Sequence, residues 1–119
     1  MTASTTPTLD VDALRAASDS IAALVAVLAD DVEWIEVDQR TQPQAPSVIR
    51  GRDAVLATIR DAEARGIHSR VTDGFAAGDR AAMTVTCTYP GGGRVVSNGL
   101  ADVRDGKITR WFGVQAWDD

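Results

Sequence analysis

The chain has 119 residues, of which 45% are hydrophobic, so it is long enough for one domain with a buried core and too short for two. Its net charge of -5, with basic residues scattered among acidic ones, predicts against nucleic-acid binding, since phosphate contacts need clustered Lys and Arg. Cys87 is the only cysteine, which excludes an intramolecular disulfide and favours a reducing compartment, the cytoplasm.

The first eight residues are predicted to form a flexible N-terminal arm, and residues 9–119 a single domain. Residues 1–7 contain no basic residue and no apolar segment, so they do not have the pattern of a secretory signal. The longest apolar run, residues 21–29, is too short to cross a bilayer, and no membrane association is expected.

Residues 9–28 have apolar side chains at helical spacing, but Ser18, Asp19 and Ser20 interrupt them with residues that begin helices, so two short helices are predicted. Residues 32–38 alternate like a strand, and the two prolines in residues 39–47 indicate a loop. A third helix is predicted over residues 51–65.

The rest of the chain is typical of four strands joined by tight turns: residues 67–77, 81–89, 94–104 and 107–117. Three successive hairpins predict an antiparallel meander, and helices followed by a sheet are the α+β pattern.

On the last strand Ile108, Phe112, Val114 and Ala116 share one face, opposite Trp111. Helices can cover only one face of such a sheet, so the outer face is expected to bind a second copy of the chain. The alternative is an ordinary exposed sheet with a few apolar residues.

Two strand faces carry the candidate site. Trp34, Glu36 and Asp38 share a face of the first strand. The predicted pocket residues beside them are Trp34, Tyr89, Ser97, Trp111, Gln115 and Trp117. A carboxylate beside indole in a partly dry cavity has a raised pKa, which would suit Glu36 as a general base. Two alternatives stay open. In the first, Glu36 is solvated or forms an ion pair with Arg50 or Arg52. In the second, the tryptophans fill the cavity instead of lining it.

The order of these elements, with LADDVEW at residues 28–34, RGRDA at 50–54 and DGKI at 105–108, resembles the nuclear-transport-factor-2-like superfamily and within it the SnoaL-like group. That group includes ketosteroid isomerases, limonene-epoxide hydrolases and polyketide cyclases. The resemblance covers residues 9–118. It implies a cone, in which a curved antiparallel sheet wraps around three N-terminal helices with an internal cavity, and a homodimer through the outer sheet face.

The resemblance also assigns catalytic positions, and this chain departs from most of them. The base of the ketosteroid isomerases falls on Glu36, but their acidic donor falls on Gly99, and their tyrosine has no counterpart in residues 9–28. The final-strand aspartate of the epoxide hydrolases falls on Gly113, and residues 81–89 lack the Arg-x-Asp pair. Losing such donors removes the largest electrostatic contribution to the reaction, so neither chemistry is expected in its known form.

Polyketide cyclases of the SnoaL type use a carboxylate, often with a histidine. The single histidine, His68, is expected at the surface or rim, and one His and one Cys do not supply a metal site. Cys87 is expected to be a small buried hydrophobe. The leading hypothesis is an isomerase or cyclase without cofactor that acts on an apolar or polycyclic molecule, with Glu36 as base. The alternatives are a non-catalytic binder of an apolar ligand and a dimeric accessory module whose cavity is filled by its own tryptophans.

Overall fold

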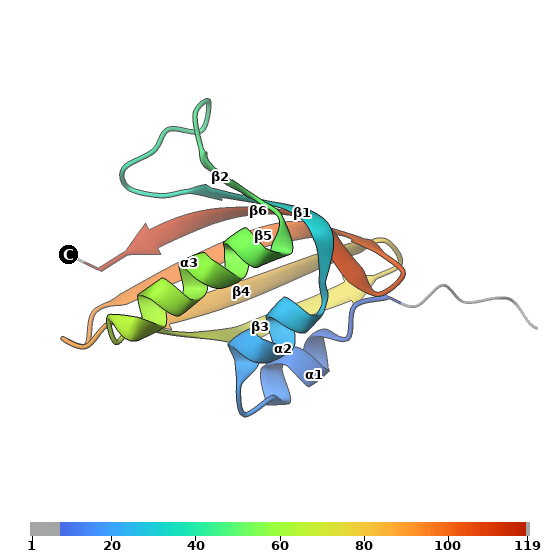
Figure 1. Ribbon diagram of the computed structural model, residues 1–119, viewed down its shortest axis with the longest axis horizontal. Helices are drawn as coiled ribbons and strands as arrows, with labels where there is room; N and C mark the ends of the chain where they lie inside the picture. The colour runs from blue at the N-terminus through green and yellow to red at the C-terminus, as the bar shows by residue number, and fades with distance from the viewer. Residues whose placement is uncertain (1–7, 119) are drawn as a thin grey trace, which may run out of the picture.

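The computed structural model describes residues 8–118 and has three helices and six strands in that range (Figure 1). In chain order these are α1 (Val11–Ala16), α2 (Ser20–Ala26), β1 (Leu28–Val37), β2 (Ser47–Arg50), α3 (Arg52–Ala64), β3 (His68–Ala77), β4 (Arg80–Thr88), β5 (Arg94–Arg104) and β6 (Lys107–Trp117). Residues 1–7 of the predicted arm lie outside the described residues. Thr8 donates a hydrogen bond from its hydroxyl to the carbonyl of Gly78, at 2.7 Å.

The predicted break between two short N-terminal helices is confirmed, and side-chain capping explains it. The carboxylate of Asp10 accepts the backbone N–H of Ala13 at 3.0 Å and begins α1. The carboxylate of Asp19 accepts the N–H of Ala22 at 2.9 Å and begins α2. Such caps satisfy N–H groups that have no partner inside the helix, so each aspartate sets where its helix begins.

The six strands form one sheet in the order β2-β1-β6-β5-β4-β3. The antiparallel meander is confirmed for β3 to β6, but β1 runs parallel to β6, so a purely antiparallel sheet was the wrong prediction. Two other predictions need correction. Strand β1 begins at Leu28, four residues earlier than expected, and the four-residue edge strand β2 was missed. Only α1 and α2 precede the sheet, because α3 follows β2.

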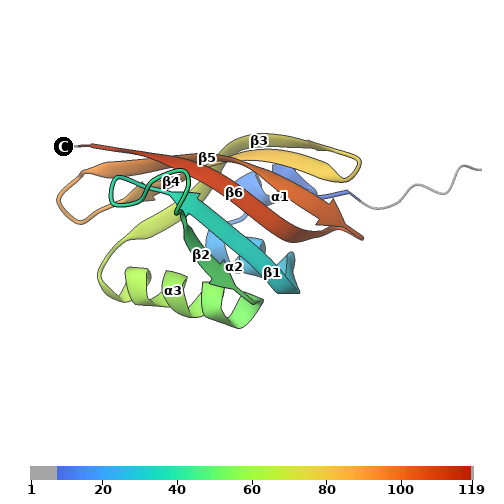
Figure 2. The ribbon, with the colours of Figure 1, turned by 90° about the horizontal axis from the view of Figure 1, so that it is seen from above.

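The fold is α+β, with a curved, open sheet that carries its helices on one face. Figure 2 shows α2 and α3 on the same side of the sheet. Helices α1 and α2 pack against β3, and α3 packs against β1. The largest fully buried side chains lie between the two layers: Trp111, Leu24, Leu28, Ile108, Val32, Val55 and Val71. None of the three helices in residues 8–118 is long and apolar enough to span a bilayer.

A bulge near the start of β6 changes which face Ile108 occupies. Asp102 pairs with Arg110, but the next residue on β5, Val103, pairs with Ile108, so Thr109 is an extra residue. An extra residue shifts the alternation of side chains by one position. Ile108 is therefore fully buried in the core, and the prediction that it shares the outer face with Phe112 was wrong.

Candidate functional site

A cavity of about 360 Å³ lies between the helices and the concave face of the sheet. Its volume falls within the range of small-molecule sites, and most of its lining is apolar. The main apolar lining residues are Ile21, Leu24, Ile49, Ile59, Val85 and Val95. Six of the seven residues predicted for the site also line it: Trp34, Glu36, Tyr89, Ser97, Gln115 and Trp117. The fold thus brings these side chains together from β1, β5, β6 and the loop after β4.

Glu36 projects into this cavity from β1, and neutral donors hold its carboxylate. The indole Nε1–H of Trp111 donates to Oε1 at 2.9 Å. The hydroxyl of Ser97 lies 3.0 Å from Oε2 and 3.2 Å from Oε1. The alternative in which Glu36 pairs with Arg50 or Arg52 is wrong, because those arginines form ion pairs with other carboxylates of β1, Glu33 and Asp30.

The surroundings of Glu36 shift its proton affinity. Burial raises the pKa of the Glu36 carboxyl above its ordinary value of 4.5, because the charged form loses hydration. Hydrogen bonds from Trp111 and Ser97 lower the pKa, and smaller contributions from Gln115 and Trp34 act in the same direction. Burial is the larger effect, so the pKa stays raised. A carboxyl group with a raised pKa is better suited to accept a proton and give it back than an ordinary surface carboxylate.

Trp111 was expected to line the cavity, but its ring is fully buried behind Glu36. It stacks on Trp34, with ring centroids 5.1 Å apart and an interplanar angle of 20°. Trp34, by contrast, lines the cavity. The two indoles therefore form two layers. One faces the cavity, and the other supports the wall and orients the carboxylate.

The glycines at positions 99 and 113 make room for this arrangement. They are partners across β5 and β6. A Cβ atom on Gly113 would lie 2.6 Å from Glu36 Oε2, from Ser97 Oγ and from Trp111 Nε1. A Cβ on Gly99 would lie 2.5 Å from Cζ2 of the Trp111 ring. The space that acidic side chains would need at these positions is thus taken by Trp111 and Glu36.

Gly113→Ala is expected to destabilise the protein by about 1–3 kcal/mol, since the new methyl group must displace buried, hydrogen-bonded atoms. Urea unfolding measures the effect. Gly91→Ala is the matched control, because no atom lies within 4 Å of a Cβ at Gly91 and its φ is not positive. Equal free energies of unfolding for the two variants would show that the atoms around Gly113 can move aside without loss of stability.

A second group of polar and aromatic side chains lies next to Glu36. The indole Nε1–H of Trp117 donates to Oε1 of Gln115 at 2.8 Å. The rings of Trp117 and Tyr89 are tilted against each other, with centroids 6.3 Å apart. Gln115 is also the cross-strand partner of Ser97. The C-terminal end of β6 therefore supplies both an apolar wall and an oriented amide.

The sequence interpretation did not include some residues of the cavity in its site. Asp38, Ser69 and Cys87 all line it. Ser69 Oγ and Cys87 Sγ lie 3.1 Å apart, and burial raises the pKa of the Cys87 thiol. The alternation of side chains in residues 32–38 indicated that Asp38 shares the face of Glu36. No such local pattern marks Ser69, which only the pairing of β3 with β4 brings next to Cys87. His68 is exposed and does not line the cavity.

No group of three or more His, Cys, Asp or Glu side chains that could hold a metal ion occurs within residues 8–118. The polar groups that line the cavity are carboxylates, hydroxyls, an amide, a thiol and the guanidinium of Arg65, and they come from strands, from α3 and its C-terminal end, and from loops. Glu36 is the one with both a raised pKa and direct neutral donors on its carboxylate. The arrangement is therefore suited to proton transfer on an apolar ligand.

Comparisons with known proteins agree with this architecture. A presumed ketosteroid isomerase from Kribbella flavida is 26% identical, with a TM-score of 0.62 over 91% of this chain and 71% of its own. An epoxide hydrolase from M. tuberculosis is 21% identical, with a TM-score of 0.58 over 89% of this chain and 76% of its own. IdmH, a presumed polyketide cyclase from Streptomyces antibioticus, is 18% identical, with a TM-score of 0.59 over 87% of this chain and 84% of its own.

No curated protein matches the chain. The family profile described as the SnoaL-like domain matches residues 11–111, from the first helix to the buried tryptophan of the last strand. This match covers most of the 119 residues. The chain belongs to the SnoaL-like domain family, within the nuclear-transport-factor-2-like fold.

Proposed function

We propose that this protein is an acid/base enzyme, an isomerase or cyclase, that binds a small apolar molecule in the cavity and uses Glu36 as its base. The observation that carries the proposal is a carboxylate in a largely apolar cavity, held by two neutral donors, Trp111 and Ser97. None of the ion pairs found among residues 8–118 includes Glu36. A base without a cationic partner keeps the affinity for protons that general-base catalysis requires.

The names of similar proteins support this reaction class. One similar structure is a presumed isomerase and another a presumed cyclase. Both reactions can proceed through a proton taken from carbon and returned elsewhere, which a single carboxyl group can perform. The apolar lining favours a substrate whose surface is mostly hydrocarbon, and the volume of about 360 Å³ favours one with few rings.

A non-catalytic binder is the second candidate. Trp111 and Ser97 would orient the Glu36 carboxylate equally well in a purely structural role. A module filled by its own tryptophans has less support. The cavity remains open with the Trp117 side chain in place, and Trp111 lies outside it.

Ligand binding is tested by quenching of tryptophan fluorescence with steroids, terpenoids and aromatic polyketides. Trp34 and Trp117 line the cavity, so we expect a ligand of the right shape to quench the emission. Ala62→Phe places a ring in the cavity wall of α3 and should abolish the effect. Ala64→Phe, on the same helix at an exposed position outside the cavity, should leave it unchanged. If no member of the panel quenches, or if both variants behave alike, the cavity is not the binding site.

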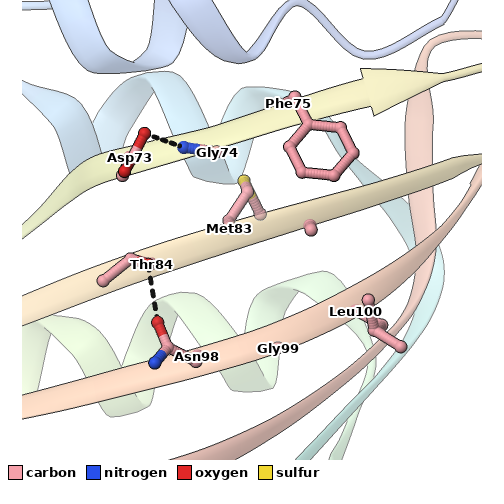
Figure 3. Close-up of a pocket in the computed structure, with 9 residues that line it drawn as sticks. Asp73, Gly74, Phe75, Met83, Thr84, Asn98, Gly99 and Leu100 are labelled. Atoms are coloured by element: carbon pink, nitrogen blue, oxygen red, sulfur yellow. Dashed lines mark hydrogen bonds between the residues drawn. The ribbon is translucent and has the colours of Figure 1, made fainter.

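We also propose that the outer face of the sheet binds a second copy of the chain. Phe75, Leu100 and Val114 are 69%, 54% and 52% exposed on that face. Figure 3 shows Phe75 and Leu100 on either side of β4, along a shallow groove. Apolar side chains of this size and number are unusual on a free surface, and a two-fold axis would cover them with identical ones.

Leu100→Arg is expected to shift the protein from dimer to monomer in sedimentation equilibrium, because it places a charge at the proposed interface. Ala57→Arg, at an exposed position of α3 on the other side of the sheet, should not change the mass. A monomeric wild-type protein at micromolar concentration would contradict the proposal.

A further inference from the structure

The orientation of the Gln115 amide is determined by its neighbour. Trp117 Nε1 lies 2.8 Å from the amide atom assigned as Oε1. An indole N–H is a donor only, so the atom that faces it must be the carbonyl oxygen, not the NH₂ group. The chemistry of the pair thus settles the choice between the two amide orientations. The NH₂ group of Gln115 points away from Trp117.

The Gln115 side chain lies in the same part of the cavity as Glu36. Gln115 lines the cavity two residues beyond Gly113, the residue that pairs with Glu36 between β1 and β6. Ser97, the cross-strand partner of Gln115, donates its hydroxyl to the Glu36 carboxylate at 3.0 Å, so Gln115 lies next to the residue that holds this carboxylate. Both a proton acceptor and an amide donor therefore face the same part of the cavity.

Gln115 differs from the other neutral donors next to Glu36 because it has a hydrogen to spare. Trp111 has one N–H and Ser97 one O–H, and both are donated to the carboxylate. An amide has two N–H groups, and the side-chain hydrogen bond that Gln115 forms within residues 8–118 uses only its oxygen, so an N–H remains for a ligand. A ligand oxygen beside Glu36 would meet this N–H without breaking a hydrogen bond.

We propose that Gln115 is a second catalytic residue, whose amide N–H donates to the carbonyl oxygen of the substrate while Glu36 takes a proton from the neighbouring carbon. The inference rests on the proposed function and names its substrate class: an apolar, cyclic carbonyl compound with an acidic C–H next to the carbonyl. Trp117 is a positioning residue, since it donates to the amide oxygen and keeps the NH₂ group turned away from its own ring.

The step is balanced without an oxidant or a further reactant. The C–H bond breaks, its proton binds to the Glu36 carboxylate, and its electron pair forms a carbon–carbon double bond. The π electrons of the carbonyl move to its oxygen, where the Gln115 N–H stabilises the new negative charge. Glu36 then returns the proton to the same carbon or to a conjugated one, which restores the enzyme and gives exchange or isomerisation.

The test uses β-tetralone, a bicyclic ketone with acidic protons, and tetralin, the same skeleton without the carbonyl. Exchange of the protons next to the carbonyl in D₂O is followed by NMR. Wild-type protein should accelerate it. Gln115→Met keeps the length of the side chain but removes the N–H, so kcat should fall by about 10²–10³-fold with little change in KM. Trp117→Phe keeps the ring but not its N–H and should cause a smaller fall in kcat.

The controls separate this inference from the function on which it rests. Gln44→Met makes the same change at an exposed loop position and should exchange like wild type. Tetralin should bind Gln115→Met as tightly as wild type, because its binding needs no donor. Exchange that needs Glu36 but is unaffected by Gln115→Met would overturn the role of Gln115 alone. If wild-type protein binds neither compound, or binds the ketone without exchange, the proposed function fails as well.

Discussion

Replacing Glu36 with Gln is expected to lower the rate of proton exchange from β-tetralone by about 10²–10⁴-fold, the usual contribution of a general base. The change is nearly isosteric. The new amide oxygen can accept the Trp111 N–H, and the new NH₂ group can donate to Ser97, so the cluster has no unpaired group. The loss of rate would then report the missing base and not a collapsed site.

The control for this variant is Glu33→Gln, on the same strand. Glu33 forms ion pairs with Arg50 and Arg110 and does not line the cavity, so its replacement should leave the rate unchanged. In wild-type protein kcat/KM should rise with pH through a value above 4.5, since only ionised Glu36 accepts a proton and its pKa is raised. If the Glu36→Gln protein exchanged protons at the wild-type rate, Glu36 would not be the base.

The same carboxyl group makes stability depend on pH, and the sign follows from the raised pKa. The folded protein holds this proton more tightly than the unfolded chain does. The stabilisation is therefore complete below the unfolded pKa and is lost as the pH rises through the folded pKa. The free energy of unfolding of Glu36→Gln, measured relative to wild type, should increase between acidic and neutral pH. A pH-independent difference would mean that the group titrates alike in both states.

Trp111→Ala is expected to lower the free energy of unfolding by about 3–5 kcal/mol, the range for deleting a large buried aromatic side chain. The ring is fully buried, stacks on Trp34 and lies against Gly99. The cavity left behind cannot be filled by Gly99 or Gly113, which have no side chains. Urea unfolding gives the value, with Trp117→Ala as control, because that ring is only half-buried and should cost less.

Trp111→Phe separates the packing of this ring from its hydrogen bond. It keeps most of the apolar volume but removes the N–H that donates to Glu36 at 2.9 Å. Because that hydrogen bond lowers the pKa, its loss should raise the pKa of Glu36 further. NMR titration of the Glu36 carboxyl carbon would show the shift. An unchanged titration would mean that the indole supports the wall but does not control the carboxylate.

Local patterns predicted much of this protein correctly. Asp19 and the residues around it predicted the break between two helices, and Asp105-Gly106 predicted the last hairpin, in which both residues have positive φ. The alternation of side chains placed Trp34, Glu36 and Asp38 on one face of β1, and all three line the cavity. These features depend on residues close together in the chain, so the sequence contains them directly.

The errors occurred where distant residues meet. The parallel pairing of β1 with β6 joins positions about 77 residues apart, Glu36 and Gly113, and no turn motif marks it. The bulge at Thr109 that turned Ile108 inward is a property of two strands together. The strand β2 has only four residues and follows a loop with two prolines, so its own sequence carried little signal.

The sequence by itself determined the order of the three helices and of every strand except β2, the cavity face of β1, and the presence of one carboxylate among aromatic side chains, because each follows from local spacing. It also placed Trp111 and Trp117 on one face of the last strand, but it did not show that the two rings lie at different depths. Depth depends on what packs across the sheet. Only the tertiary structure showed that Gly99 and Gly113 leave room for the Trp111 ring. That ring donates a hydrogen bond to Glu36, whereas Trp117 lines the cavity and donates to the Gln115 amide.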